Sequence, residues 1–228
     1  MRNRVRYTSP CYKRIIMDIN FWIQKWENND IAFHESKPNP ALVQYFSGLG
    51  LAKGCRVFLP LCGKTLDMAW LLSQGYQVVG AELSRMAIEQ LFAELKIKPE
   101  ISERGEVVHY RAKDIDIFVG NIFDVSKKTL GPADAIYDRA ALVALPETMR
   151  HEYTAHIMEI TDAAPQLLLS YEYDQSLMEG PPFSVTNEEV KCHYGKSYDV
   201  KLMDSIDIPG GLKGKCPAKE HIWLLSHL

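Results

Sequence analysis

Residues 55–83 read CRVFLPLCGKTLDMAWLLSQGYQVVGAEL and contain a complete strand, turn, helix and strand pattern. The first apolar run, residues 55–61, is short and continuous, as in a buried strand. A helical pattern over residues 65–74 stops at Gly75, and a second apolar run follows over residues 77–83. Two strands joined by a helix predict a parallel pair, the building unit of α/β proteins.

The alternation of strands and helices continues along most of the chain. After a helical pattern that Ser84 can cap, a polar and charged stretch is interpreted as a connection. Further strands are predicted at residues 116–120, 134–138 and 165–174, with a long helix opened by Pro146 between the last two. This order predicts a mostly parallel sheet with helices on both faces.

The C-terminal segment has a different pattern. A short helix is predicted near residues 186–195, followed by strand patterns over residues 197–208 and 220–225 that a glycine-rich turn joins. Because no full helix separates these two strands, we expect an antiparallel hairpin at one edge of the sheet.

The N-terminal region divides at Met17. From there, apolar residues at positions 19, 22, 23 and 26 have the spacing of a short amphipathic helix, which is interpreted as a lid. Residues 1–16 carry five basic residues and no acidic one, without the apolar region of a secretory signal. We interpret them as a flexible tail or as a consequence of start-site choice, and predict a single domain over residues 17–228.

Composition excludes several classes of protein. A net charge of −3 over 228 residues gives no global positive field to attract nucleic acid or acidic lipid. The five cysteines are odd in number and form no C-x-x-C pair, and the histidines show no ligand spacing, so no metal site is predicted. No apolar stretch approaches the roughly 20 residues that span a bilayer. We therefore expect a cytoplasmic protein without nucleic-acid or membrane partners.

The turn PLCGK, residues 60–64, predicts the kind of ligand. In a sheet of this type the ligand lies beyond the carboxyl ends of the strands. The turn has one glycine where a pyrophosphate-binding turn has G-x-G-x-x-G, and Glu82 follows at the spacing of an acid that binds ribose hydroxyls. S-adenosylmethionine has an adenosine but no diphosphate, and the N–H groups of the helix near Thr65 favour its carboxylate. A dinucleotide is the alternative.

Residues of three other segments can take part in a site. Asp138 and Arg139 end the fourth predicted strand, where they form a buried ion pair or where Arg139 orients an electron-rich acceptor. Trp22 and Trp26 share a helix face, either as a core pair or as aromatic cover for a sulfonium. Cys62 has no histidine nearby in the sequence, so we interpret it as a packing residue of the turn.

Several segments together resemble thiopurine S-methyltransferases, particularly bacterial ones. They are FWIQKWENNDIAFHESKPN, FLPLCGKTLDMAWLLSQGYQVVGAELS, YDRAALVALPETMRHEY and EGPPFSV, in the same order as in that family. The resemblance implies a class I, Rossmann-like methyltransferase fold with a seven-stranded sheet. It also implies a monomeric detoxification enzyme that methylates the sulfur of aromatic or heterocyclic thiols and releases S-adenosylhomocysteine.

The resemblance also implies roles for individual residues. Aromatic residues of the N-terminal segment cover the cofactor, the first turn and the second strand contact its backbone and ribose, and the turn GNIFD lies next to adenine. The residues concerned are Trp26, Phe33, Leu61, Glu82, Asn121, Ile122 and Arg139.

On the acceptor side, the resemblance places Arg139 at the boundary between cofactor and acceptor. Arg139 favours an anionic acceptor, and Asp138 positions Arg139 or takes a proton through water. The C-terminal turn lacks an arginine that some relatives have near the acceptor, so Lys213 or Lys215 is the candidate replacement.

Other functions remain open at this point. A methyltransferase for selenium or tellurium species, thiocyanate or halide would use the same cofactor residues with a smaller acceptor pocket. A non-catalytic binding protein would keep the cofactor contacts without turnover, and a nicotinamide oxidoreductase would bind NAD instead.

Overall fold

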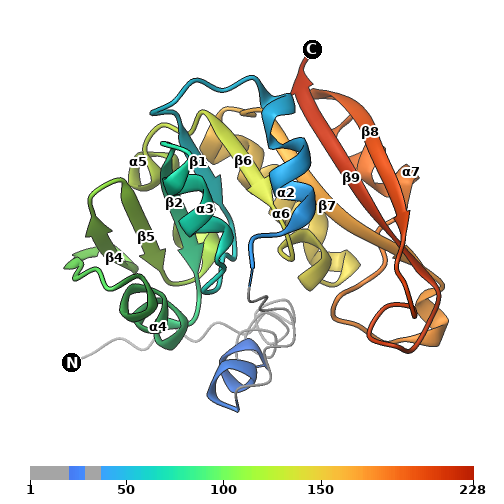
Figure 1. The fold of residues 1–228 in the computed structure, drawn as a ribbon, viewed down its shortest axis with the longest axis horizontal. Coiled ribbons are helices and arrows are strands. Elements are labelled where there is room, and N and C mark those ends of the chain that lie inside the picture. Colours follow the sequence, from blue (N-terminus) through green and yellow to red (C-terminus); the bar gives the residue numbers. More distant parts are fainter. Residues whose placement is uncertain (1–20, 29–36) are drawn as a thin grey trace, which may run out of the picture.

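The computed structural model of the chain describes residues 21–28 and 37–228. Within these residues, nine strands form one sheet in the order β3-β4-β5-β2-β1-β6-β7-β9-β8 (Figure 1). Its centre consists of five parallel strands, which are β1 (Arg56–Leu59), β2 (Gln77–Glu82), β5 (Ile115–Val119), β6 (Ala135–Asp138) and β7 (Gln166–Tyr173). The hairpin of β8 (Tyr198–Asp207) and β9 (Ala218–His227) continues the sheet from β7 in antiparallel orientation. The predicted fold class and the predicted C-terminal edge are confirmed.

Helices cover both faces of the sheet, as the alternation predicted. Figure 1 shows α2 (Pro40–Tyr45) and α3 (Asp67–Ser73) in front of the sheet and α6 (Glu147–Thr161) behind it. Together with α4 (Arg85–Leu95), the front helices contribute to one hydrophobic cluster. The other cluster contains residues of α5 (Lys127–Leu130), α6 and α7 (Asn187–Tyr194). The central strands are mostly apolar because both of their faces are covered by helices.

Local signals set the ends of these helices. The Ser84 hydroxyl accepts a hydrogen bond from Ala87 N–H at 3.2 Å, which confirms the predicted cap of α4. Gly75 follows α3 with a φ of +88°, a conformation that glycine adopts without a steric penalty. The helix after the first turn begins at Asp67, two residues later than Thr65, where the sequence pattern placed it.

The sheet has two more strands than the seven that the family resemblance implied. The stretch interpreted as a polar connection contains β3 (Glu100–Arg104) and β4 (Val107–Ala112), an antiparallel hairpin that pairs with β5. Every residue of β3 is exposed, because this strand forms the edge of the sheet. Its sequence, EISER, therefore lacks the apolar signal by which the central strands were found.

The N-terminal helical pattern is present, and residues 21–27 are helical. In Figure 1 this helix lies beyond the carboxyl ends of the parallel strands. Trp26 is 5% exposed, and its ring lies against Gly63 of the first turn. Among the described residues, no helix is long and apolar enough to cross a membrane.

Four short turns also connect these elements in the described part of the chain. They are the 3₁₀ turns η1 (Phe46–Leu49), η2 (Ile122–Asp124), η3 (Leu142–Ala144) and η4 (Gln175–Leu177). Of these, η2 follows β5 and η3 follows β6, so both lie where the ligand of such a sheet binds.

Candidate active site

The turn after β1 is built from strained backbone and close packing. Leu61 and Gly63 both have positive φ, at +45° and +52°. Cys62 N–H donates to Ala81 C=O at 3.0 Å, and the Cys62 sulfur lies only 2.8 Å from where a side chain on Gly80 would begin. The turn is therefore fixed directly against β2. Left-handed conformations at residues other than glycine cost about 1–3 kcal/mol and occur often at ligand sites.

Cys62 packs inside this turn and is buried. Burial and the nearby Glu82 raise the pKa of its thiol well above the usual value. A thiol in that state is a poor nucleophile. The geometry thus supports the interpretation of Cys62 as a packing residue.

Glu82, at the end of β2, joins the first turn to the start of α4. One carboxylate oxygen accepts from Gly63 N–H and the other from Ser84 N–H, both at 2.8 Å. The pKa of Glu82 is raised above its usual value, because the effect of burial exceeds the lowering effect of these backbone N–H donors. A carboxylate has about four acceptor positions, so two remain for hydroxyl donors of a ligand.

Trp26 completes this side of the site. A side-chain carbon at Gly63 would lie 3.1 Å from the Trp26 ring, so only glycine leaves the ring in place. Trp26, Gly63 and Glu82 are thereby brought together from the N-terminal helix, the first turn and β2. Phe33, the other predicted aromatic cover, lies outside the described residues.

The turn after β5 lies next to Glu82. Gly120 N–H donates to the backbone C=O of Glu82 at 2.9 Å. Asn121 caps η2, its side-chain oxygen accepting from Phe123 N–H at 3.2 Å, and Ile122 is buried. The predicted adenine neighbours, Asn121 and Ile122, are therefore adjacent to the predicted ribose residue.

Asp67 occupies the first turn of α3, where the sequence predicted a ligand carboxylate. Its side chain is 1% exposed, and it accepts from Asn39 N–H at 2.7 Å and from the Tyr137 hydroxyl at 3.1 Å. The negative charge already at this helix start disfavours a second carboxylate. The attraction between these helix N–H groups and a ligand carboxylate stays a prediction, and Asp67 is the carboxylate that occupies this helix start in the fold.

Arg139 and Asp138 take opposite directions from the end of β6. Arg139 Nη1 lies 3.8 Å from Asp67 on the α3 side of the sheet. The Asp138 carboxylate accepts from Leu142 N–H at 3.1 Å and from the Tyr153 hydroxyl of α6 at 2.8 Å. Successive residues of a strand point to opposite faces, which explains the separation. Asp138 therefore orders the segment that follows Arg139, with burial raising the pKa of Asp138 to about 6.

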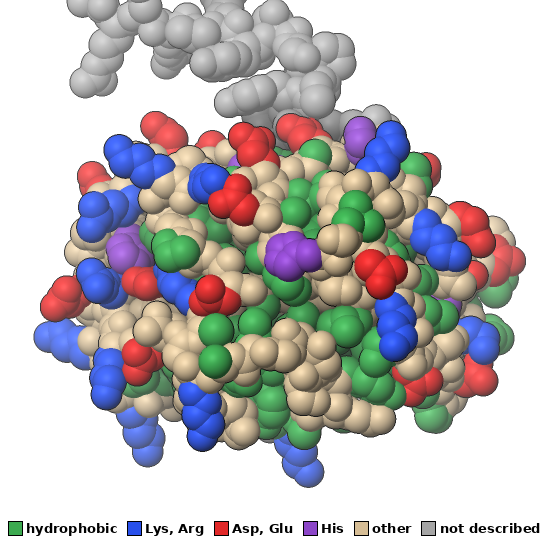
Figure 2. All heavy atoms as spheres, turned by 90° about the horizontal axis from the view of Figure 1, so that it is seen from above, with side chains coloured by type: hydrophobic (Ala, Val, Ile, Leu, Met, Phe, Trp, Pro, Cys, Tyr) green, Lys and Arg blue, Asp and Glu red, His purple; other side chains and the backbone are tan. Residues whose placement is uncertain are grey.

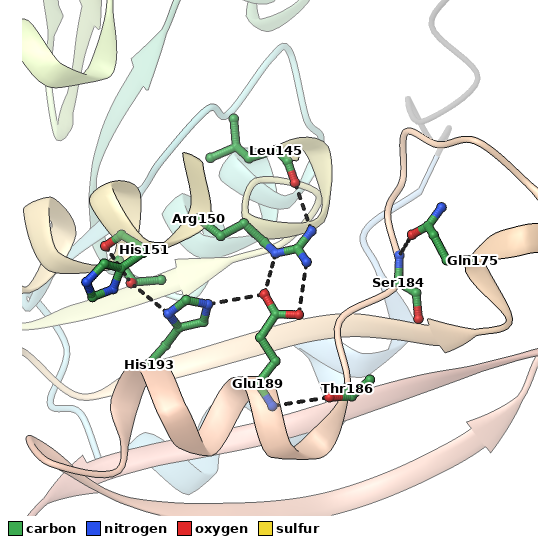
Figure 3. Close-up of polar contacts among 9 residues, drawn as sticks. Leu145, Arg150, His151, Gln175, Ser184, Thr186, Glu189 and His193 are labelled. Atoms are coloured by element: carbon green, nitrogen blue, oxygen red, sulfur yellow. Dashed lines mark hydrogen bonds and ion pairs between the residues drawn. The ribbon is translucent and has the colours of Figure 1, made fainter. Parts of the chain in front are cut away.

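A buried ion pair joins α6 to α7 behind that segment (Figure 3). Arg150 donates to both carboxylate oxygens of Glu189, at 2.5 and 2.9 Å, and to Leu145 C=O at 3.0 Å. Although burial raises the pKa of Glu189, hydrogen bonds from His193 and Arg150 hold it below its usual value. Arg150 therefore fixes the end of η3 relative to α7, a contact that the sequence did not reveal.

The EGPPFSV segment, residues 179–185, lies against η3. Phe183 N–H donates to Val143 C=O at 2.7 Å. Ser184 N–H donates to the Gln175 side chain at 2.8 Å, as Figure 3 shows. Lys213 is exposed and donates to Pro181 C=O at 2.7 Å, whereas Lys215 is exposed on the same turn. Of the two candidate lysines, Lys213 is thus the one attached to this segment.

A surface groove lies away from this constellation. It has a volume of about 840 Å³ and is lined by residues near the amino ends of β6 and β7, such as Asp134 and Pro165, and by His227. Figure 2 looks onto that edge and shows acidic and basic side chains interspersed. Within the described residues, no cluster of three or more His, Cys, Asp or Glu side chains has the arrangement of a metal site.

Comparison with known proteins shows similarity to thiopurine S-methyltransferases over most of the chain. The family model described as Thiopurine S-methyltransferase (TPMT) matches residues 17–221. A thiopurine S-methyltransferase of Xanthobacter autotrophicus is 53% identical over 92% of this chain and 99% of its own length. One of Acinetobacter baylyi is 49% identical over 92% of this chain and 99% of its own.

Solved structures share the fold at low sequence identity. A 1,6-didemethyltoxoflavin-N1-methyltransferase of Burkholderia thailandensis, with S-adenosylhomocysteine bound, has a TM-score of 0.63 and 15% identity, covering 98% of this chain and 93% of its own. A TehB-like SAM-dependent methyltransferase of Corynebacterium glutamicum has a TM-score of 0.56 and 12% identity, covering 92% and 98%. These likenesses concern the fold.

Replacing Glu82 tests the donor half of the site. Hydrogen bonds to charged groups contribute about 1.5–3 kcal/mol, so Glu82→Ala should weaken S-adenosylmethionine binding by roughly 10- to 100-fold. Isothermal titration calorimetry measures the change, with thermal unfolding recorded in parallel because Glu82 also holds Gly63. Glu89→Ala, which alters an exposed glutamate of α4, is the control. Unchanged affinity in a folded Glu82→Ala variant would contradict the ribose assignment.

Asp138 should make stability depend on pH. Its pKa of about 6 in the fold exceeds the usual 3.8, so its contribution to folding is complete below pH 3.8 and is lost as the pH rises through 6. A difference of about two pKa units corresponds to roughly 3 kcal/mol. Asp138→Asn has no charge; its amide oxygen can still accept from Leu142 N–H, and its amide nitrogen can donate to the Tyr153 hydroxyl. The stability of this variant relative to wild type should therefore rise across this range.

Urea unfolding at several pH values between 4 and 7 measures this difference. Asp199→Asn, at an exposed position of β8, is the matched control. A stability difference between Asp138→Asn and wild type that does not vary with pH would show that Asp138 is not held as the structure indicates.

Proposed function

The chain belongs to the thiopurine S-methyltransferase family, and we propose that it methylates the sulfur of aromatic and heterocyclic thiols with S-adenosylmethionine as donor. The observation that carries this proposal is the contact of Glu82 with the single-glycine turn. It supports the proposal because Glu82, whose carboxylate can accept hydrogen bonds from two hydroxyl groups, lies beside a turn without the glycines that a diphosphate requires.

The residues present fit the donor. Glu82 has acceptor capacity for a diol, and Gly63 holds a position that any side chain would fill. We propose that Leu61 and Gly63 contact the donor through their backbone, that Asn121 and Ile122 border the adenine, and that Trp26 covers the site. When bound, S-adenosylmethionine supplies a methyl group on a sulfonium centre, which is an excellent leaving group.

The task of the protein is then mainly alignment and exclusion of water. A simple thiol has a reference pKa of about 8.5 and is partly ionised near neutral pH, so a dedicated general base is not required. Arg139 directly follows β6, the strand next to β1, and offers a planar set of N–H donors to an anionic sulfur or a ring atom of the acceptor. We assign Arg139 to orientation of the acceptor.

Asp138 supports that role indirectly. Its hydrogen bonds to Leu142 and Tyr153 hold the η3 segment that continues from Arg139. Transfer of an acceptor proton through water to Asp138 is the weaker assignment, because both carboxylate oxygens already accept hydrogen bonds on the α6 side.

The wider organisation is part of the same proposal. We propose a single cytoplasmic domain over residues 17–228 that works as a monomer, with the N-terminal helix as its lid. Detoxification of foreign thiols, or of selenium and tellurium compounds, is the physiological role that fits a soft nucleophilic acceptor. The contact of Trp26 with Gly63 supports the lid.

A methyl-transfer screen tests the proposed reaction. We expect S-adenosylhomocysteine to form with thiophenols and thiopurines faster than with thiocyanate, iodide, selenite or tellurite, because Arg139 presents a forked donor to a planar acceptor. Turnover with small anions alone would favour the alternative acceptor class. Binding of S-adenosylmethionine without product from any acceptor would indicate a non-catalytic binding protein, and calorimetric binding of NAD would point to an oxidoreductase.

Arg139→Ala separates the acceptor from the donor. We expect kcat for an aromatic thiol to fall by about two orders of magnitude, the cost of a misplaced reacting group, with a much smaller change in donor affinity. Stopped-flow single-turnover rates and donor calorimetry measure the two effects. Arg85→Ala, at an exposed arginine of α4, is the control. Equal kcat in Arg139→Ala and wild type would remove Arg139 from the reaction.

A further inference from the structure

Asp67 is a buried acid with contacts from two other elements, the start of α2 and the end of β6. Its carboxylate accepts from Asn39 N–H, at the start of α2, and from the Tyr137 hydroxyl of β6. The same oxygen that meets Tyr137 lies 3.8 Å from Arg139 Nη1. Two hydrogen bonds therefore fix the orientation of the carboxylate independently of Arg139.

The position of Asp67 follows from the register of β6. Tyr137 and Arg139 are two residues apart and so project from the same face of the strand, the face that α3 covers. Asp138, between them, projects toward α6 and contacts Tyr153. Asp67 is thus on the correct side of the sheet to act on Arg139, whereas Asp138 is on the other.

Burial strengthens the interaction between these charges. The side chains of Asp67 and Arg139 are 1% and 10% exposed, so little water screens the attraction between them. Because other partners hold the Asp67 carboxylate in place, it can restrict the long Arg139 side chain to one orientation. The Arg139 side chain is thereby directed toward the helix that follows the donor turn.

We propose that Asp67 is a positioning residue that orients Arg139 for the acceptor. Asp67 lies four residues after Gly63, at the start of the helix that follows the same turn. It therefore fixes the position of the acceptor arginine relative to the turn that contacts the donor. This role rests on the proposed methyl transfer and on the assignment of Arg139 to the acceptor. It makes Asp67 part of the alignment of the two substrates without contact to either.

A double-mutant cycle tests the role. Asp67→Asn keeps the shape of the side chain and its capacity to accept from Asn39 while removing the charge. We expect kcat/KM for an aromatic thiol to fall about tenfold in the wild-type background, with donor affinity by calorimetry unchanged within about twofold. In the Arg139→Ala background, the same substitution should cause no further loss, because Asp67 acts through Arg139.

The matched control is Asp116→Asn. Asp116 forms an ion pair with Arg56 at 3.1 Å near the amino end of β5, away from the proposed site. Its replacement removes an ion pair of the same kind, so activity should be retained. This comparison separates a general effect on the fold from a specific effect on Arg139.

The outcomes distinguish this inference from the proposed function. Additive losses in the cycle, or full activity of Asp67→Asn, would overturn the positioning role while leaving methyl transfer in place. Absence of product with every thiol in the wild-type protein would overturn both. Equal activity of wild type and Arg139→Ala would remove Arg139 from the reaction and the positioning role with it.

If Asp67→Asn does not fold, chemical rescue of Arg139→Ala decides the question. Methylguanidinium added to this variant should restore activity at least tenfold better than methylammonium, because the fixed carboxylate of Asp67 accepts a planar pair of N–H groups. Equal restoration by the two cations, or restoration by neither, would overturn the positioning role.

Discussion

The hydrogen bond from Gly63 N–H to the Glu82 carboxylate is the contact on which the site depends. It joins the turn after β1 to the end of β2, two segments 19 residues apart in the sequence. The second oxygen of Glu82 holds Ser84, the cap of α4, so one buried acid orders both turns and the start of a helix. Bonds of this charge-assisted kind contribute about 1.5–3 kcal/mol each, enough to fix the local geometry before a ligand arrives.

This constraint explains why a turn with one glycine is sufficient. Gly63 combines a positive φ with close contact to the Trp26 ring, and the Cys62 sulfur occupies the space above Gly80. A turn packed this tightly against β2 leaves no need for the additional glycines that admit a diphosphate. The arrangement suits a ligand that presents a ribose to Glu82 and continues as a small, flexible chain.

Most of the fold could be predicted because its central strands are buried on both faces and its helices have clear ends. The β3–β4 hairpin was missed because β3 is an exposed edge strand with a polar sequence. Asp67 was missed because the sequence pattern places the start of α3 at Thr65. An acidic residue in the first turn of a helix is common for its favourable interaction with the helix dipole, so it gave no sign of a buried role. Arg150 did carry a signal, since it shares the buried face of α6 with Tyr153 and Ile157, and a buried arginine requires a partner.

Because side chains alternate along β6, residues at its end are held by contacts on both faces of the sheet. Asp138 points to the α6 side and holds η3, whereas Arg139 points to the α3 side and meets Asp67. On the first side, the Arg150–Glu189 pair and the contact of Phe183 with Val143 connect η3 to the EGPPFSV segment. The η3 segment is therefore held from the α6 face of the sheet, whereas Arg139 meets α3 on the opposite face. The residues proposed for the donor follow strand ends with a recognisable spacing, whereas the contacts that hold η3, such as that of Arg150 with Glu189, join residues far apart in the sequence and follow no such pattern.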